Sequence, residues 1–262
     1  MISGHTCLAR GVSSIEYLDR AAGSAPGRDY KRRLLDALDV RAGHTVLDVG
    51  CGPGTDLAAL ADAVGPTGTV IGVDGDPAMV AEAQRRLAGR PVDIRAGDAH
   101  ALPLTDASVD RARVDRVLQH VTSPPRALAE LHRVLRPEGV LTLAEPDWDT
   151  LVIDSRDLAT SRAFARFLRS RVRNDAIGRQ LGRLAGDAGF AVRALATVPI
   201  TFTDVEVGDQ ILEVRRNAGH AVDAGWMSAD AAAAWVRGLT EGPFLAAFIL
   251  FTVTAIRVAG AG

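Results

Sequence analysis

The sequence predicts an α/β fold: a Rossmann-like sheet of seven mostly parallel strands with helices on both faces, a helical N-terminal cap, and helical insertions after the fifth and sixth strands. Short apolar runs alternate with helix-patterned segments from Arg41 to Glu145, and this alternation produces right-handed crossovers and a parallel sheet. A glycine-rich stretch, "GCGPG", follows the first apolar run, as in nucleotide-binding turns. With 262 residues, of which 47% are hydrophobic, the chain can bury a sizeable core.

The first five strands are expected within residues 41–145. Each is a short apolar run bounded by glycine or charged residues, which is typical of a strand buried on both faces. The expected strands are 44–50, 68–74, 92–98, 108–117 and 140–145. Helical spacing covers 55–65, 76–89 and 124–139, with Asp76 as an N-cap and Gly65 and Gly89 as stop signals.

Helices are also expected on both sides of this cofactor-binding core. Residues 1–40 form the helical cap, and 146–262 supply substrate-side helices and two closing strands, at about 190–200 and 244–258. The connection from Thr203 to Glu241 is too long for a hairpin, so we expect it to roof the substrate site. The whole chain, 1–262, is expected to form one domain.

Charge and composition argue against several kinds of partner. The net charge of −2 argues against nucleic acid and anionic membranes, whose partners usually carry a basic excess. Cys7 and Cys51 lie far apart without metal-ligand spacing, so we expect no metal site and a reducing compartment. The most apolar segment, 244–256, is too short to cross a bilayer. A cytoplasmic protein is therefore expected, and nothing in the pattern specifies its oligomeric state.

The glycine turn departs from the dinucleotide fingerprint. Counting from Gly50, the spacing is G-x-G-x-G and the sixth position is Thr55, so the third glycine of G-x-G-x-x-G is absent and NAD is disfavoured. Asp74 ends the second strand, where a carboxylate can accept hydrogen bonds from both hydroxyls of a ribose. Asp98 ends the third strand, where it either accepts from an adenine amino group or only forms a turn.

Four consecutive motifs resemble those of class I S-adenosylmethionine-dependent methyltransferases, of the small-molecule branch that includes the ubiquinone and menaquinone biosynthesis enzymes. They are "VLDVGCGPG", "VIGVDGDPAMV", "GDAHALPLTDASVDRARVDRVLQHV" and "ALAELHRVLRPEGVL", and they cover about 41–145. The resemblance implies S-adenosyl-L-methionine as the cofactor and transfer of its methyl group to O, C or N of a small molecule, such as a secondary metabolite. "RPEG" stands where the family more often has a double-glycine turn.

The resemblance also implies which residues would hold the cofactor. Those for the methionine moiety are Asp48, Gly50, Gly52, Gly54, Arg116 and Gln119. Asp48 either holds the turn or orients the ammonium group, and Asp74 takes the ribose hydroxyls. Those for the adenine are Gly75, Met79, Asp98 and Ala99.

Methyl transfer from a sulfonium needs alignment above all, and it needs a general base only when the acceptor arrives protonated. His120 is the best candidate for that base, because it follows the fourth strand at the edge where open α/β sheets bind ligands. The alternative is a histidine that packs beneath the cofactor. Asp147 and Glu145 are expected to leave the fifth strand at the same edge, as base, as ligand for a substrate amine, or as a loop turn. His5 and Tyr17 are weaker candidates from the N-terminal segment.

Two other classes of function compete with this hypothesis. A cyclase or isomerase on the same fold would show the same cofactor motifs while transferring no methyl group. A protein or RNA methyltransferase is disfavoured, because an Asn/Asp-Pro-Pro-aromatic motif is absent after the fourth strand and the charge is near neutral.

Overall fold

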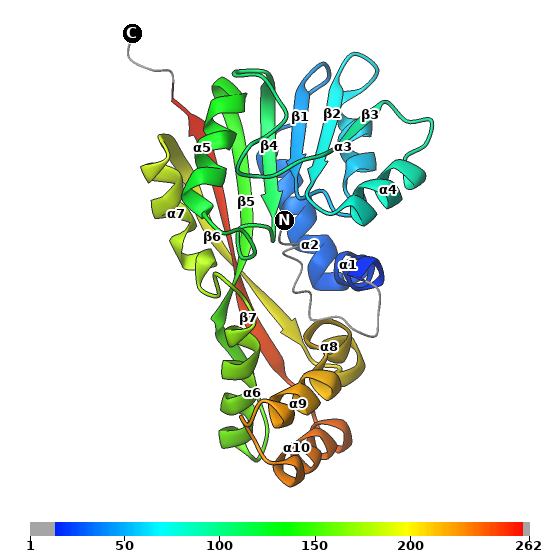
Figure 1. The fold of residues 1–262 in the computed structure, drawn as a ribbon, viewed down its shortest axis with the longest axis vertical. Coiled ribbons are helices and arrows are strands. Elements are labelled where there is room, and N and C mark those ends of the chain that lie inside the picture. The colour runs from blue at the N-terminus through cyan, green and yellow to red at the C-terminus, as the bar shows by residue number, and fades with distance from the viewer. Residues whose placement is uncertain (1–13, 259–262) are drawn as a thin grey trace.

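The computed structural model describes residues 14–258 and contains one sheet of seven strands in the order β3-β2-β1-β4-β5-β7-β6. All neighbouring pairs from β3 to β5 are parallel, whereas β7 runs antiparallel to both β5 and β6. Helices cover both faces of the sheet (Figure 1). The predicted seven-stranded, mostly parallel fold is therefore confirmed.

The strands are β1 Thr45–Val49, β2 Thr69–Asp74, β3 Val92–Ala96, β4 Val109–Asp115, β5 Leu135–Ile153, β6 Phe190–Phe202 and β7 Ala246–Arg257. The helices before β5 are α1 Ser14–Gly23, α2 Ala25–Leu38, α3 Leu57–Val64, α4 Pro77–Arg86 and α5 Pro124–Val134. Those after it are α6 Leu158–Ser170, α7 Ile177–Asp187, α8 Val205–Leu212, α9 Val214–Asp223 and α10 Ala229–Glu241.

Alternate residues of the central strands enter two separate apolar clusters, which explains why these strands are apolar throughout. On β1, Val46 packs with residues of α2 and α3, whereas Leu47 packs with residues of α5 and α7. A strand covered on both faces cannot alternate apolar and polar side chains. The predicted N-cap of α4 is also confirmed, because the Asp76 carboxylate accepts the Ala78 N–H at 2.8 Å.

The fifth strand and the helix before it were predicted with the wrong bounds. The helix ends at Val134, because Leu135 already pairs with Val109 of β4. The strand continues well past Glu145 to Ile153, because β7 pairs with it from Val140 to Asp147 and, after an irregularity, again at Val152 and Ile153. That partner lies about a hundred residues later in the chain, and short-range patterns carry no information about such a pairing.

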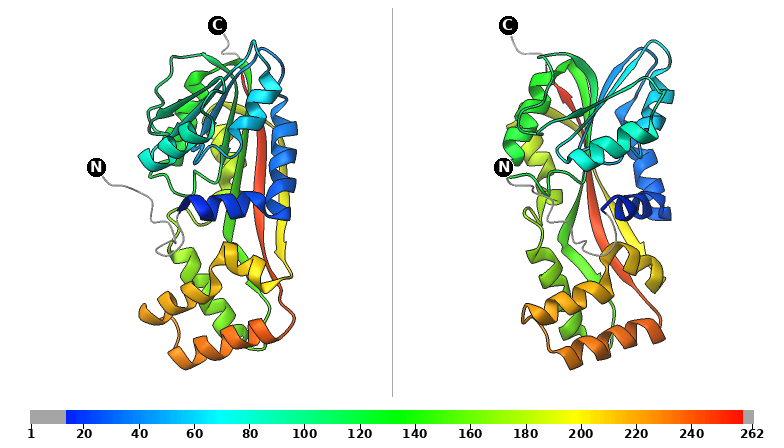
Figure 2. Two further views of the ribbon diagram at one scale, coloured as in Figure 1. Left: turned by 90° about the vertical axis from the view of Figure 1, so that its right-hand side faces the viewer. Right: turned by 45° about the vertical axis from the view of Figure 1, so that its right-hand side comes forward.

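The long strands β5, β6 and β7 carry the sheet beyond its parallel part to a second group of helices (Figure 2). We call α6, α8, α9 and α10 the distal helices. Their apolar side chains and those of the strand ends form one buried cluster, in which Phe164 and Trp235 are in ring contact. Helical insertions after the fifth and sixth strands are thus confirmed, and α8–α10 fill the predicted connection. Among the helices of residues 14–258, not one has the length and apolarity needed to cross a bilayer.

Candidate functional site

The glycine turn after β1 adopts a backbone that only glycine takes readily. Gly50, Gly52 and Gly54 have φ angles of 70°, 55° and 81°. A Cβ built at Gly50 would lie 2.2 Å from Cγ2 of Val117, so the turn also presses closely against the loop that follows β4. A Cβ at Gly52 would have only Leu18 of α1 nearby, at 3.4 Å. The turn therefore offers bare backbone toward α1.

Asp74 holds the glycine turn to the end of β2. Its side chain is buried, with Oδ2 accepting the Gly52 N–H and Oδ1 accepting the Asp76 N–H, each at 2.8 Å. Both oxygens retain acceptor capacity, because an ionised carboxylate offers about four lone-pair sites. The sequence prediction and the geometry thus agree on where this carboxylate lies.

The residues expected around an adenine lie after β2, on α4 and after β3. Met79 is buried on α4 and Gly75 is exposed, while Ala99 packs partly against the core. Asp98 is exposed, and its Oδ1 accepts the N–H of His100 at 2.9 Å and lies 2.6 Å from Nδ1 of the same residue. These bonds from His100 lower the pKa of Asp98 and keep it ionised.

His100 links the segment after β3 to the start of α5 through hydrogen bonds. Its Nε2 accepts the backbone N–H of Ser123, the N-cap of α5, at 3.1 Å. An imidazole that accepts at Nε2 carries its proton on Nδ1, so the hydrogen bond at 2.6 Å is donated to Asp98. His100 was not predicted as a site residue, although it lies only two residues after Asp98 in the sequence.

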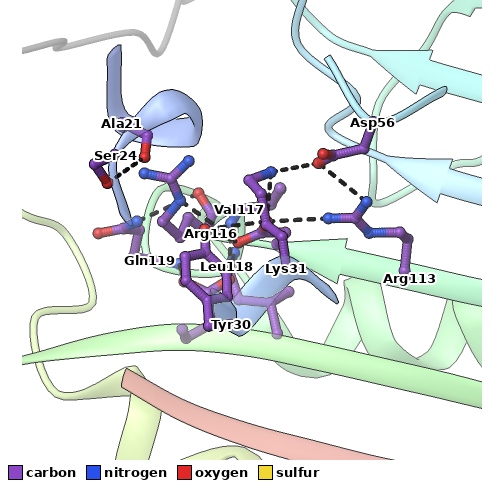
Figure 3. Close-up of polar contacts among 12 residues, drawn as sticks. Ala21, Ser24, Tyr30, Lys31, Asp56, Arg113, Arg116, Val117, Leu118 and Gln119 are labelled. Atoms are coloured by element: carbon purple, nitrogen blue, oxygen red, sulfur yellow. Dashed lines mark hydrogen bonds and ion pairs between the residues drawn. The ribbon is translucent and has the colours of Figure 1, made fainter. Parts of the chain in front are cut away.

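A buried network of charges lies beside the glycine turn (Figure 3). Arg113 is buried on β4, 3.0 Å from a carboxylate oxygen of Asp56 and of Asp115, and its Nε lies 3.6 Å from Asp48. Lys31 on α2 reaches the same two acids, Asp56 and Asp115. Burial raises the pKa of Asp48 to about 6, and Arg113 opposes that rise. Asp48 and Asp56, which lie before and after the glycine turn in the sequence, thus both face the guanidinium of Arg113.

Arg116 lies next to this network, as the first residue of the loop after β4. Its φ of 59° places a non-glycine residue in the left-handed region, a strained conformation that must be held by its surroundings. Its Nε lies 3.5 Å from Asp115 Oδ1 without hydrogen-bond geometry, and within residues 14–258 this buried donor has no hydrogen-bond partner. A donor of this kind is suited to an incoming carboxylate.

Glu145 holds that loop from β5. Its carboxylate is fully buried and accepts the N–H groups of Val117 at 2.7 Å, Leu118 at 2.5 Å and Gln119 at 3.3 Å. Burial raises the pKa of Glu145 to about 8, against the effect of the three donors. The carboxylate of Glu145 therefore holds the loop in place by binding its main-chain N–H groups.

Both polar groups of the Gln119 side chain make hydrogen bonds within the protein. Its side chain is buried, with Nε2 donating to Arg116 O at 3.3 Å and Oε1 accepting from Trp148 Nε1 at 2.8 Å. Asn174, between α6 and α7, donates from Nδ2 to Leu118 O and Val121 O, both at 2.8 Å. Asn174 was missed because it lies more than fifty residues from the loop and belongs to no motif.

The two candidates for acid–base chemistry differ in their surroundings. His120 is exposed at the end of the loop, where its backbone N–H donates to the carbonyl oxygen of Val117 at 2.9 Å. Asp147 is fully buried within β5, and both its oxygens accept from Arg179 of α7. Asp147 therefore lies in a strand and not after one, as the extended β5 requires. Tyr17 is half-buried on α1, and His5 lies outside the described residues.

Comparisons with known proteins agree with this geometry. Residues 47–143 match the model of a methyltransferase domain family. An uncharacterized 37.1 kDa protein of transposon Tn4556 from Streptomyces fradiae is 50% identical over 97% of this chain and 74% of its own length. A demethylmenaquinone methyltransferase of Lactobacillus johnsonii is 34% identical over 46% of this chain. The match spans about half of that relative, 51% of its length.

A solved structure shares the overall fold. The crystal structure of an S-adenosylmethionine-dependent methyltransferase from Aquifex aeolicus superposes with a TM-score of 0.58 at 22% identity. The match covers 94% of this chain and 98% of the other. It thus extends over the distal helices as well as the motif-bearing half.

Proposed function

Because this chain belongs to the class I S-adenosylmethionine-dependent methyltransferases, we propose that it methylates O, C or N of a small molecule. When bound, S-adenosylmethionine supplies a methyl group already activated by the positive charge on sulfur. The chain must then align the acceptor with that methyl group and exclude water from it.

Two charged features fit the methionine and ribose ends of the cofactor. Arg116 offers a buried donor for the carboxylate, beside a turn whose glycine backbone allows close approach. Asp74 offers its remaining lone pairs to the ribose hydroxyls, and a 2′-phosphate would be repelled there. Gln119 acts indirectly, by holding the loop on which Arg116 lies, because its own side-chain atoms are engaged with Arg116 O and Trp148.

The observation that carries the proposal is the bond between Gly52 and Asp74. It joins the backbone of the glycine turn, proposed to hold the methionine moiety, to the acid at the end of β2, proposed to hold the ribose, at 2.8 Å, so the protein itself holds these two parts of the site together. A site formed before its ligand arrives loses less conformational entropy on binding.

His120 is the proposed general base for an acceptor that arrives protonated. It is exposed on the loop that Glu145, Gln119 and Asn174 hold in place, while the other candidate, Asp147, is engaged with Arg179. The proton would pass from the acceptor to the imidazole as the methyl group is transferred. A small-molecule acceptor is favoured over nucleic acid by the near-neutral net charge of −2.

The test has two parts. Calorimetry should show binding of S-adenosylmethionine and S-adenosylhomocysteine, and no binding of NAD. Incubation with donor carrying a labelled methyl group, together with an extract of small metabolites, should then transfer label to a small molecule. Tighter binding of NAD would contradict the cofactor assignment. Donor binding with an altered but unlabelled product would instead identify a cyclase or isomerase.

A further inference from the structure

The carboxylate of Asp98 is held in one position although it faces the solvent. Its side chain is 67% exposed, whereas the side chain of His100 is only 13% exposed. Oδ1 of Asp98 accepts the backbone N–H of His100 at 2.9 Å and lies 2.6 Å from Nδ1 of the same residue. An exposed side chain ordinarily keeps its rotamer freedom, and a ligand that orders it must overcome that entropy. At Asp98 a single neighbouring residue already supplies the order.

The imidazole of His100 is fixed from its other side as well. Its Nε2 accepts the backbone N–H of Ser123 at 3.1 Å and lies 3.4 Å from Oγ1 of Thr122. Acceptance at Nε2 leaves the proton on Nδ1, which donates it to the carboxylate of Asp98. Both ring nitrogens are therefore engaged, and the ring cannot turn without breaking a hydrogen bond.

Helix α5 supports the segment that carries this histidine. Residues 97–108 lead from β3, at the edge of the sheet, past β2 and β1 to β4 (Figure 1). Arg126 of α5 donates from Nε to the carbonyl oxygen of His100 at 3.1 Å. Further along the helix, Arg133 donates from Nη2 to the carbonyl oxygen of Leu102 at 3.1 Å. The backbone and the ring of His100 are thus both held by a regular helix or its N-cap.

The position of Asp98 relates it to the proposed ribose ligand. The N–H of Gly97 donates to the carbonyl oxygen of Asp74 at 2.9 Å, so the ends of β2 and β3 lie side by side. Both hydrogen bonds from His100 are made to Oδ1 of Asp98, which leaves Oδ2 to accept from a ligand. In a nucleoside bound through its ribose at Asp74, the base is the part that can extend toward this oxygen.

We propose that His100 is a positioning residue for recognition of the cofactor's base: it holds Oδ1 of Asp98 so that Oδ2 accepts a hydrogen bond from the 6-amino group of adenine. This inference rests on the proposed methyltransferase function and on the cofactor that it uses. His100 does not touch the cofactor itself and acts only through Asp98. The preference of the site for a purine with a 6-amino group therefore depends on the imidazole, whereas the binding of the ribose does not.

The test compares two ligands that differ in one hydrogen-bond donor. They are S-adenosylhomocysteine and its 6-deamino analogue, in which a hydrogen atom replaces the amino group of the purine. Calorimetry on the wild-type protein should show S-adenosylhomocysteine binding at least about tenfold more tightly, because only this ligand can donate to the carboxylate. Equal affinities for the two ligands would overturn the proposal.

His100→Ala should weaken binding of S-adenosylhomocysteine by at least about threefold, since a carboxylate that must be ordered on binding loses affinity. The affinity for the 6-deamino analogue should stay as in wild type, because that ligand makes no use of Asp98. A purely structural role of His100 would weaken both ligands equally, and that result would contradict the proposal, as would unchanged affinity for both. His220→Ala, on α9 among the distal helices, is the matched control and should bind both ligands as wild type does.

Two conservative variants separate the two hydrogen bonds of the ring. In His100→Asn the side-chain amide N–H can take the place of Nδ1–H and still donate to Asp98, whereas in His100→Gln the side-chain oxygen can take the place of Nε2 and still accept from Ser123. We expect His100→Asn to keep the preference for S-adenosylhomocysteine and His100→Gln to lose most of it. Rescue by Gln alone would refute the role through Asp98. Thermal unfolding checks that each variant is folded, and the comparison of Asn with Gln decides if His100→Ala is not.

Failure of this inference is distinguishable from failure of the proposed function. Wild-type protein that binds neither S-adenosylhomocysteine nor its analogue would reject the cofactor and the function that depends on it. Wild-type protein that binds S-adenosylhomocysteine, with a preference over the analogue that His100→Ala leaves intact, would reject only the role of His100.

Discussion

Asp74 Oδ2 accepts a hydrogen bond of 2.8 Å from the backbone N–H of Gly52, across twenty-two positions of sequence. One carboxylate therefore holds the glycine turn, and the same carboxylate is the one proposed to bind the ribose hydroxyls. A variant at this position changes the fold and the site together, so its two effects must be measured separately.

Asp74→Ala should weaken binding of S-adenosylhomocysteine by about 1.5–3 kcal/mol, the range for charge-assisted hydrogen bonds. It should also lower the free energy of unfolding, since two backbone N–H groups lose their acceptor. Calorimetry measures the first effect and denaturant unfolding the second. Unchanged cofactor affinity in a folded variant would reduce Asp74 to a turn residue.

Gly50→Ala should reduce the free energy of unfolding by about 2 kcal/mol or more and abolish cofactor binding. The new Cβ would meet Val117 at 2.2 Å, and the φ of 70° strains any side chain. Gly238→Ala is the matched control, because nothing lies within 4 Å of its Cβ position on α10. That substitution should stabilise the helix by roughly 0.5–1 kcal/mol. Equal effects at both sites would refute the steric argument.

The stability of the protein should depend on pH through Glu145. Burial raises the pKa of its carboxyl from the usual 4.5 to about 8, so between these values the folded protein keeps a proton that the unfolded chain releases. Stability from this group should therefore fall as pH rises from about 5 to 8, by on the order of 1 kcal/mol per unit.

Glu145→Gln isolates this effect, because the amide does not titrate. The Tm of the variant relative to wild type should rise steadily between pH 5.5 and 8.5. Parallel Tm curves across that range would mean that the three N–H donors keep the carboxylate ionised throughout.

His120→Ala should lower kcat by about 10²–10⁴-fold if the imidazole removes the acceptor proton. Cofactor affinity should change little, and the wild-type rate should fall as pH drops through the imidazole pKa, near 6.5 in model compounds. The rate of the variant should not show this fall at low pH. His44→Ala, at the opposite end of β1, serves as the histidine control. Weakened cofactor binding with an unchanged kcat would instead mean that His120 supports the cofactor.

The sequence alone determined the parts of this protein whose signals are local. Alternating strands and helices, the N-cap Asp76, and the positions of Gly50, Gly52, Gly54 and Asp74 could all be predicted, because a turn or cap is specified by residues within a few positions of each other. The helical connection between the sixth and seventh strands was also visible from its length and periodicity.

Only the tertiary structure decided what depends on distant partners. β5 runs to Ile153 because β7 pairs with it from about a hundred residues away. Glu145 and Asn174 both hydrogen-bond to main-chain groups of the loop between Arg116 and Val121, because the packing of the folded chain brings them there. Among the described residues, the burial of polar side-chain atoms of Glu213 and Asn217 without a hydrogen-bond partner is likewise a feature of the folded chain only. Burial makes a polar atom costly or useful, and burial is a property of the folded chain.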